Sequence, residues 1–308
     1  MEDRQLIEKI KRDVLYGHEI LPPQVDTDKC IGCGQCVKVC PALVFELRNK
    51  KSEVRYGEGC FACGHCWAVC PQEAVTQEEV TTATSLKPGS EPAVSADNLQ
   101  LLIRERRSTR LFKDKPVSKE QLLKIIEAGR YSPTGSNRQD INYSVVSERQ
   151  KVSELRSLVE NFMKKTFKIM ENKVVSFIYS IKYGRSAVDM LRYYAMGYHF
   201  LKDHEEKNAY WPLPFGSAVI ITHAQSFDEL APFNCSVALY NCSLMAHSMG
   251  LGSCFMGFVQ AGANMDKKIK HWLNIPKEDK AYGAMLVGHP DVKYLRLVER
   301  KKPIVTWC

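Results

Sequence analysis

Two cysteine-rich runs with one pattern lie near the start of the chain: CIGCGQCVKVCP from Cys30 to Pro41, and CFACGHCWAVCP from Cys60 to Pro71. Each run reads Cys-x2-Cys-x2-Cys-x3-Cys-Pro, the bacterial spacing for 4Fe-4S ligation. The two-residue gaps bring three thiolates onto one cluster, and the fourth cysteine ligates the other cluster. The repeat predicts one ligand set of Cys30, Cys33, Cys36 and Cys70, and a second of Cys60, Cys63, Cys66 and Cys40.

Structural zinc is the alternative for such a cysteine cluster, but zinc sites usually use two separated Cys-x2-Cys pairs. Two identical quartets favour iron-sulfur clusters instead. The glycines in the runs, Gly32, Gly34 and Gly64, allow close backbone approach and positive φ. Residues 24 to 79, including VDTDKC before the first run and CPQEAV at the end of the second, resemble the bacterial two-cluster ferredoxins.

Length and charge limit what the rest of the chain does. At 308 residues there is room for about two domains. Residues 1 to 80 hold 10 Lys+Arg and 13 Asp+Glu, net −3, which leaves 33 and 22, net +11, for the remainder. The basic residues are dispersed and no aromatic-rich motif interleaves them, so we expect no nucleic-acid partner. We also expect no membrane span and no secretory signal, and therefore a cytoplasmic protein.

Three regions follow from composition: a two-cluster ferredoxin-like domain with an N-terminal helix at 1–80, a linker at 81–98, and a larger domain at 99–308. The linker is rich in Thr, Ser, Pro, Gly and Glu. In the larger domain, Ser118 and Gln121 predict a capping box that starts a helix. Strands are predicted at 141–146, 217–224 and 282–290, and further helices around 152–162 and 236–252, which indicates an α+β fold.

The larger domain shows no dinucleotide-binding fingerprint. GLGSCF, from Gly250 to Phe255, lacks the third glycine of G-x-G-x-x-G and follows a predicted helix rather than a strand. Four other short segments are informative together: RERRSTRLF (104–112), YSPTGSNRQ (131–139), GLGSCFMGF (250–258) and ERKKP (299–303). In this order they resemble the FMN-dependent nitroreductase family over residues 99 to 308. That resemblance implies a central, mainly antiparallel sheet flanked by helices.

The resemblance also implies roles for individual residues. Arg106, Ser108 and Arg110 are expected to contact the flavin phosphate, ribityl chain and pyrimidine edge, with Arg107 contributing its backbone. Pro133, Thr134 and Asn137 are expected to reach FMN across a homodimer interface. Met256 and Gly257 match a pair whose backbone N–H groups face flavin N5 and O4, and Arg300 and Lys302 match two basic residues that close on the phosphate.

The chain departs from the family at two places. The family usually continues Asn-x-Gln with Pro-Trp, whereas Gln139 is followed here by Asp140 and Ile141. Residues 161–215 lie where the family varies. The aromatic residues of that segment (Tyr193, Tyr194, Tyr198 and Trp211) fit either a substrate pocket or ordinary packing.

No side chain is expected to be an obligatory catalytic acid or base, because the flavin does the chemistry. Cys235, Cys242 and Cys254 are predicted to be buried apolar residues, and terminal Cys308 to be inert. His223, His247 and His289 show no ligand spacing.

The sequence thus predicts a homodimeric oxidoreductase that passes electrons between two 4Fe-4S clusters and FMN to reduce a small organic oxidant, such as a nitroaromatic, quinone or enone. NAD(P)H and reduced ferredoxin are both candidate electron donors. The alternatives are an adaptor that relays electrons to a partner protein, and a specialised reductive dehalogenase or flavin-fragmenting enzyme.

Overall fold

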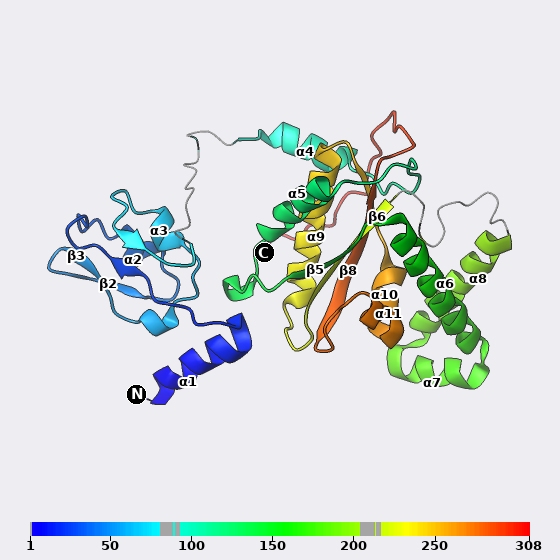
Figure 1. The fold of residues 1–308 in the computed structure, drawn as a ribbon, viewed down its shortest axis with the longest axis horizontal. Coiled ribbons are helices and arrows are strands. Elements are labelled where there is room, and N and C mark those ends of the chain that lie inside the picture. The colour runs from blue at the N-terminus through cyan, green and yellow to red at the C-terminus, as the bar shows by residue number, and fades with distance from the viewer. Residues whose placement is uncertain (1, 81–88, 90–92, 204–212, 214–216) are drawn as a thin grey trace. The chain divides into compact units, whose positions relative to one another are not determined.

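The computed structural model describes residues 2–80, 89, 93–203, 213 and 217–308 (Figure 1). These residues form two units. We call Met1–Ala93 together with Pro133–Asp140 the cysteine unit, and Val94–Ser132 together with Ile141–Cys308 the sheet unit. Most of the predicted linker at 81–98 lies outside the described residues. Helix α4 begins at Ala96, within the range predicted as linker, and Pro133–Asp140 groups with the cysteine unit.

The cysteine unit begins with helix α1 (Glu2–Ile10) and a π-helical turn η1 (Lys11–Tyr16), which Gly17 ends at φ 74°. Its other elements are short: β1 (Gln24–Val25), α2 (Gln35–Val39), β2 (Phe45–Arg48), β3 (Lys51–Val54), the 3-10 turn η2 (Gly57–Gly59), α3 (His65–Ala68) and β4 (Val75–Thr76). Strand β1 pairs antiparallel with β4, and β2 with β3. The two-residue β2–β3 turn places Asn49 and Lys50 at φ 45° and 60°, as a tight hairpin requires.

The sheet unit is built on four strands in the order β5-β6-β8-β7, and every neighbouring pair is antiparallel. The strands are β5 (Asn142–Val146), β6 (Ser217–Gln225), β7 (Gly252–Phe255) and β8 (Asp279–Gly288). The predicted α+β class and antiparallel sheet are therefore confirmed. Strand β7 was not anticipated from the sequence, because it is short and directly follows a helix ended by Gly250 at φ 74°.

Helices cover both faces of this sheet (Figure 1). They are α4 (Ala96–Glu105), α5 (Lys119–Arg130), α6 (Arg149–Glu171), α7 (Lys173–Tyr183), α8 (Arg185–Asp203), α9 (Ala231–Ser248), α10 (Gly257–Met265) and α11 (Lys267–Trp272). Strand β6 explains the two-sided packing. Its Val219 and Ile221 join the core formed with α6, α10 and α11, whereas Ala218 and Ile220 join the core formed with α5 and α9. Alternate residues of a strand point to opposite faces, so a strand apolar at every position needs cover on both.

No helix among the described residues has the length and apolar character needed to cross a membrane. The segment 161–215, where the family varies, continues α6 and forms α7 and α8 within its described part.

The predicted capping box is present at the start of α5. The Ser118 hydroxyl accepts from the Gln121 N–H at 3.2 Å, and the Gln121 side chain accepts from the Ser118 N–H at 3.1 Å. We expect Ser118→Ala to lower the free energy of unfolding of the sheet unit by about 1 kcal/mol. Thermal or denaturant unfolding of the full chain measures this. The control is Ser157→Ala on α6, an exposed position whose hydroxyl only bonds back to the Ser153 carbonyl and where alanine is a good helix former.

Candidate functional site

The two predicted cysteine quartets each surround a cavity of their own in the cysteine unit. Cys30, Cys33, Cys36 and Cys70 line one cavity. Cys40, Cys60, Cys63 and Cys66 line the other. The fourth cysteine of each run therefore lies with the first three of the other run, as the crossed pattern predicts. In the described part of the chain, no three His, Cys, Asp or Glu side chains are spaced for a single metal ion.

Backbone N–H groups point at the cysteine sulfurs in both repeats. The Val44 N–H donates to Cys40 Sγ at 3.4 Å, and the Ala74 N–H donates to Cys70 Sγ at 3.2 Å. These two contacts occupy the same position in the two runs, four residues after the crossing cysteine. Hydrogen bonds to cluster sulfur raise the reduction potential, because they stabilise the added negative charge.

A lysine supports the first cysteine of each quartet. Lys11 Nζ donates to the Cys60 carbonyl and, at 3.1 Å, to the Glu58 carbonyl. Lys51 Nζ donates to the Cys30 carbonyl and, at 2.8 Å, to the Thr27 carbonyl. Burial lowers the pKa of Lys11. Both ammonium groups thus lie beside the backbone that would carry a cluster.

Two cysteines of the second quartet, Cys60 and Cys66, resist ionisation because they are buried. Burial raises the pKa of Cys60, and it raises the pKa of Cys66 to about 11. A thiol with a raised pKa is protonated at neutral pH. Iron binding must therefore displace these protons, which is the ordinary coupling between metal binding and thiol ionisation.

The predicted flavin-binding segment Arg106–Arg110 runs beside β7 in the sheet unit. Ser108 forms a parallel bridge with Ser253, and the Thr109 N–H donates to the Ser253 carbonyl at 2.9 Å. Arg106 Nε and Nη1 are buried, and neither has a hydrogen-bond acceptor among the described residues. Buried guanidinium donors are costly without an acceptor. They fit an anionic or strongly polar ligand such as FMN.

Arg106, Ser108 and Arg110 all lie near Cys254 of β7. Burial raises the pKa of its thiol, and Arg110, a hydrogen bond with Ser108, and Arg106 all act in the opposite direction. These three predicted flavin residues are therefore gathered around one strand. Cys254 itself is 3% exposed, and Cys235 and Cys242 are fully buried, so the prediction of buried apolar cysteines is confirmed.

Met256 and Gly257 lie at the start of α10. The Met256 backbone N–H donates to the Ala284 carbonyl of β8 at 2.8 Å, within the sheet unit. Gly257 begins α10, and the N–H groups of the first helical turn have no intrahelical acceptor. A Cβ at Gly257 would meet nothing within 4 Å, so space is open there. That Met256 and Gly257 present their N–H groups to a flavin stays a prediction.

The remaining basic residues are less closely grouped. Arg107 lies over the Tyr294 ring, 5.9 Å from its centroid. Arg300 and Lys302 lie in an exposed segment without regular secondary structure, and neither forms a hydrogen bond or ion pair with a residue that the structure describes. Their predicted closure on a phosphate stays a prediction.

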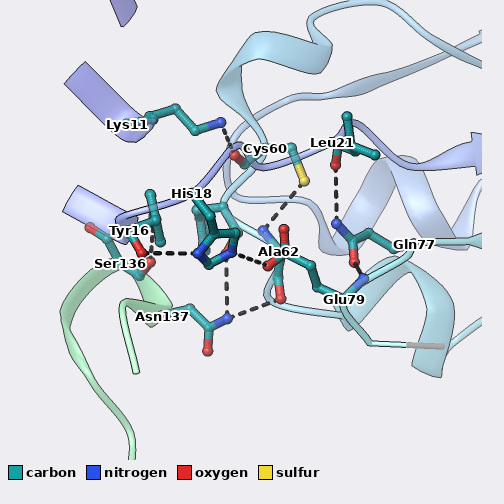
Figure 2. Close-up of polar contacts among 11 residues, drawn as sticks. Lys11, Tyr16, His18, Leu21, Cys60, Ala62, Gln77, Glu79, Ser136 and Asn137 are labelled. Atoms are coloured by element: carbon teal, nitrogen blue, oxygen red, sulfur yellow. Dashed lines mark hydrogen bonds and ion pairs between the residues drawn. The ribbon is translucent and has the colours of Figure 1, made fainter. Parts of the chain in front are cut away.

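Pro133, Thr134 and Asn137 lie in the segment that groups with the cysteine unit. Thr134 Oγ1 accepts from the Gln139 N–H at 3.0 Å. The Asn137 side-chain amide donates to the Phe61 carbonyl at 3.3 Å. It also donates to the Ala62 carbonyl at 2.9 Å (Figure 2). The sequence did not predict this contact. That these residues reach FMN of a partner chain also stays a prediction.

The aromatic residues of α8 divide between packing and exposure. Tyr198 is 3% exposed and packs on Phe167 at 5.5 Å between ring centroids. Tyr194 is half-exposed and lies edge-on to Phe258 of α10 at 5.6 Å. Tyr193 is exposed, and Trp211 lies outside the described residues. Core packing thus explains Tyr198, whereas Tyr194 places a ring next to the start of α10.

Sequence reasoning also missed a buried polar pair. His223 Nδ1 lies 2.6 Å from Asp279 Oδ2, and both side chains are almost fully buried. His223 is on β6 and Asp279 begins β8, so only strand pairing brings them together. No local spacing could have revealed the pair.

The first cysteine loop offers a sharp test. Gly32 has φ 71°, and a Cβ there would lie 2.0 Å from the Lys50 carbonyl oxygen. We expect Gly32→Ala to lose iron and sulfide from the first cluster after anaerobic reconstitution, with the second cluster retained. The control is Gly17→Ala, which shares the positive φ of 74° but meets nothing within 4 Å. Equal iron content in the two variants would contradict the expectation.

Gly252 allows the arginine segment to approach β7. A Cβ there would lie 2.7 Å from three side-chain atoms of Thr109. We expect Gly252→Ala to push this segment away and to weaken FMN binding by at least tenfold, because the guanidinium donors are displaced from the ligand. Fluorescence titration of the flavin-free protein with FMN measures this. Gly197→Ala on α8, where a Cβ meets nothing within 4 Å, is the control.

Comparison with known proteins finds a match for the cysteine repeats and another for the larger domain. The nitroreductase family model matches residues 103–289, and the 4Fe-4S dicluster domain model matches residues 29–75. Ferredoxin-3 of Desulfocurvibacter africanus is 58% identical over 55 residues, 18% of this chain and 90% of that protein. Ferredoxin-2 of Desulfomicrobium norvegicum is 68% identical over 28 residues, 9% of this chain, and the match spans about half (48%) of its length.

A nitroreductase structure with bound FMN from Bacteroides fragilis shares the fold of the larger part. It is 22% identical, has a TM-score of 0.50, and the similarity covers 68% of this chain and 98% of that one. The family model spans more than half of the chain. The chain therefore belongs to the nitroreductase family and carries a 4Fe-4S dicluster ferredoxin domain at its N-terminal end.

Proposed function

We propose that the protein is an FMN-dependent oxidoreductase in which two 4Fe-4S clusters exchange electrons with FMN and FMN reduces a small organic oxidant. The observation that carries the proposal is that one chain combines two four-cysteine cavities with buried Arg106 donors that have no acceptor in the described part of the chain. The cysteine cavities can hold one-electron carriers, and the Arg106 donors can bind an anionic cofactor. A homodimer is part of the proposal, because the family resemblance assigns Pro133, Thr134 and Asn137 to a partner's flavin.

The residues of this chain have distinct tasks. Arg106 holds negative charge, since a guanidinium is always protonated and its donors are already desolvated. The backbone pairing between the Arg106–Arg110 segment and β7 fixes where Arg106 and Arg110 lie along the strand. Gly257 presents a backbone N–H beside open space, without a side chain to obstruct a planar ring. Bound FMN supplies the hydride and one-electron chemistry.

On the cluster side, the chain stabilises the reduced state. The N–H groups of Val44 and Ala74 donate to the crossing cysteines, and Lys11 and Lys51 place positive charge next to the first cysteine of each set. A cluster that gains an electron gains negative charge, so these donors favour that state. The half-exposed Tyr194 ring beside Phe258 supports a flat, apolar oxidant such as a quinone or nitroaromatic.

The first experiment measures cofactors and then electron flow. Anaerobically reconstituted protein should hold eight irons and one FMN per chain. Reduced ferredoxin, NADH and NADPH are then offered separately, with cluster and flavin absorbance followed, and quinones, nitroaromatics and enones are tested as oxidants. We expect electrons from reduced ferredoxin to reach FMN. Failure to bind FMN after reconstitution would overturn the proposal, and turnover only with a protein acceptor would favour the adaptor function.

Arg106 is tested by substitution. Arg106→Gln keeps some hydrogen-bonding capacity but removes the charge, and we expect FMN affinity to fall by about 10- to 100-fold, the usual range for a hydrogen bond to a charged group. Equilibrium titration of flavin-free protein gives the value. Arg149→Gln is the matched control, because that arginine forms only an exposed ion pair with Asp114. Unchanged FMN affinity in Arg106→Gln would remove Arg106 from the site.

A further inference from the structure

Helix α7 of the sheet unit presents its apolar side chains to solvent. Val174, Phe177, Ile178 and Ile181 follow the spacing i, i+3, i+4, i+7, which places them on one face of the helix. Each of these side chains is between 60% and 72% exposed. We call these four residues the α7 stripe. A surface helix of a globular protein normally turns such a stripe towards the core, so the orientation of α7 is the reverse of what its sequence pattern predicts.

The opposite side of α7 is the one that packs within the sheet unit. Ser176 is buried, and its hydroxyl accepts a hydrogen bond from Arg192 Nη2 of α8 at 3.2 Å. Val175 and Tyr179 lie on the same side and are half-buried. Helix α7 packs against α6 and α8, and Figure 1 shows it at the outer edge of the sheet unit. None of the described residues covers the α7 stripe.

Helix α8 also exposes apolar side chains. Gly184, at φ 86°, turns the chain from α7 into α8. Met190, Tyr193 and Met196 follow at intervals of three residues, and each is more than half exposed. Groups of exposed apolar side chains on one element mark sites that bind another protein or a membrane.

Positive charge borders the α7 stripe on both sides. Lys173 lies four residues before Phe177, and Lys182 lies four residues after Ile178, so each is next to the stripe on the helix surface. Both lysines are exposed, and neither forms an ion pair with a described residue. Residues 161–200 hold 7 Lys+Arg and 2 Asp+Glu, net +5. The apolar stripe therefore lies in a basic surface.

This charge disfavours a second copy of the chain as the partner of the stripe. A two-fold contact uses the same patch on both subunits. Two copies of the stripe would bring their bordering lysines together, and like charges that face each other across an interface cost energy. The surface of an anionic bilayer offers negative charge beside an apolar interior, so it matches both the lysines and the stripe.

We propose that α7 is a docking site for an anionic membrane surface. The helix lies in the plane of the membrane, with Val174, Phe177, Ile178 and Ile181 among the acyl chains and with Lys173 and Lys182 at the lipid phosphates. The protein rests on the bilayer and does not cross it. The proposal concerns the outer surface of the sheet unit, so it does not depend on the cofactors or on the function proposed above.

The affinity comes from two separable contributions. Burial of one isoleucine side chain strengthens binding by about tenfold or more. A lysine near an anionic surface contributes about fivefold, and salt weakens that contribution because it screens the charge. Removing an apolar residue and removing the lysines should therefore both weaken binding, and only the lysine contribution should depend on salt.

The test uses the complete, cofactor-loaded protein and its sedimentation with lipid vesicles. One set of vesicles is phosphatidylcholine alone, and the other is phosphatidylcholine and phosphatidylglycerol in equal parts. We expect binding to the mixed vesicles that falls as salt is added, and much weaker binding to phosphatidylcholine alone.

The apolar contribution is tested with Ile178→Gln, which removes one side chain of the stripe and keeps a good helix former. We expect binding to the mixed vesicles to weaken by about tenfold or more. The matched control is Leu123→Gln, because Leu123 is also an exposed aliphatic residue on a helix, α5. This control should bind the vesicles as the parent chain does.

The charge contribution is tested with Lys173→Gln and Lys182→Gln together. We expect a loss of about fivefold for each lysine at low salt, and a smaller loss at high salt. The matched control is the pair Lys119→Gln and Lys124→Gln, two exposed lysines of α5, which changes the net charge by the same amount.

Far-UV circular dichroism, iron content and FMN content of every variant show that the fold and the cofactors are retained, so failure of the proposed function is seen separately. Absence of binding to the mixed vesicles, or equal binding by Ile178→Gln and Leu123→Gln, would overturn the proposal. A change in oligomeric state of Ile178→Gln, without vesicle binding by the parent chain, would instead assign the stripe to a contact between copies.

Discussion

The number of thiolates that a 4Fe-4S cluster requires constrains the whole N-terminal part of this protein. Each run of cysteines supplies three ligands close together and a fourth that is directed elsewhere. Neither run can complete a cluster alone, so the two runs must fold against each other. The pairing of β1 with β4 and the arrangement of each quartet around its own cavity follow from that exchange. Lys11 and Lys51 and the N–H groups of Val44 and Ala74 repeat the same support in both halves.

The sheet unit meets a different requirement: under the proposed function it holds an anionic planar group beside β7. Strand β6 is apolar on both faces and is covered on both, which gives a rigid base. Strand β7 then brings Ser108, Arg106 and Arg110 around Cys254. The buried Arg106 donors that find no acceptor among the described residues carry an energetic cost, and a bound anion would offset it. Such buried, unsatisfied donors are a common mark of a ligand site.

The Pro133–Asp140 segment groups with the cysteine unit, although its neighbours in the chain, Ser132 and Ile141, belong to the sheet unit. Its chain ends enter the sheet unit, and its Asn137 amide binds the loop between Cys60 and Cys63. The ion pair of Arg138 with Asp140 and the positive φ angles around it give this segment a defined shape. The second cysteine loop is buried by these contacts, whereas the identical spacing in the first repeat leaves Ile31 and Cys33 open to solvent. The two repeats thus share their cysteine spacing but differ in how far their loops are exposed to solvent.

Local patterns in the sequence were enough to predict much of this protein. Cysteine spacing indicated both quartets, alternation and apolar runs indicated three of the four strands, and Ser118 with Gln121 indicated the start of α5. These features depend on residues close together in the chain, so local chemistry decides them. Tertiary structure alone decided the use of the Met256 N–H in the sheet, the His223–Asp279 pair, the position of β7 and the binding of Asn137 to the second cysteine loop. Each of these joins backbone or side-chain groups from distant segments, and their pairing depends on strand order and on burial, which no local spacing encodes.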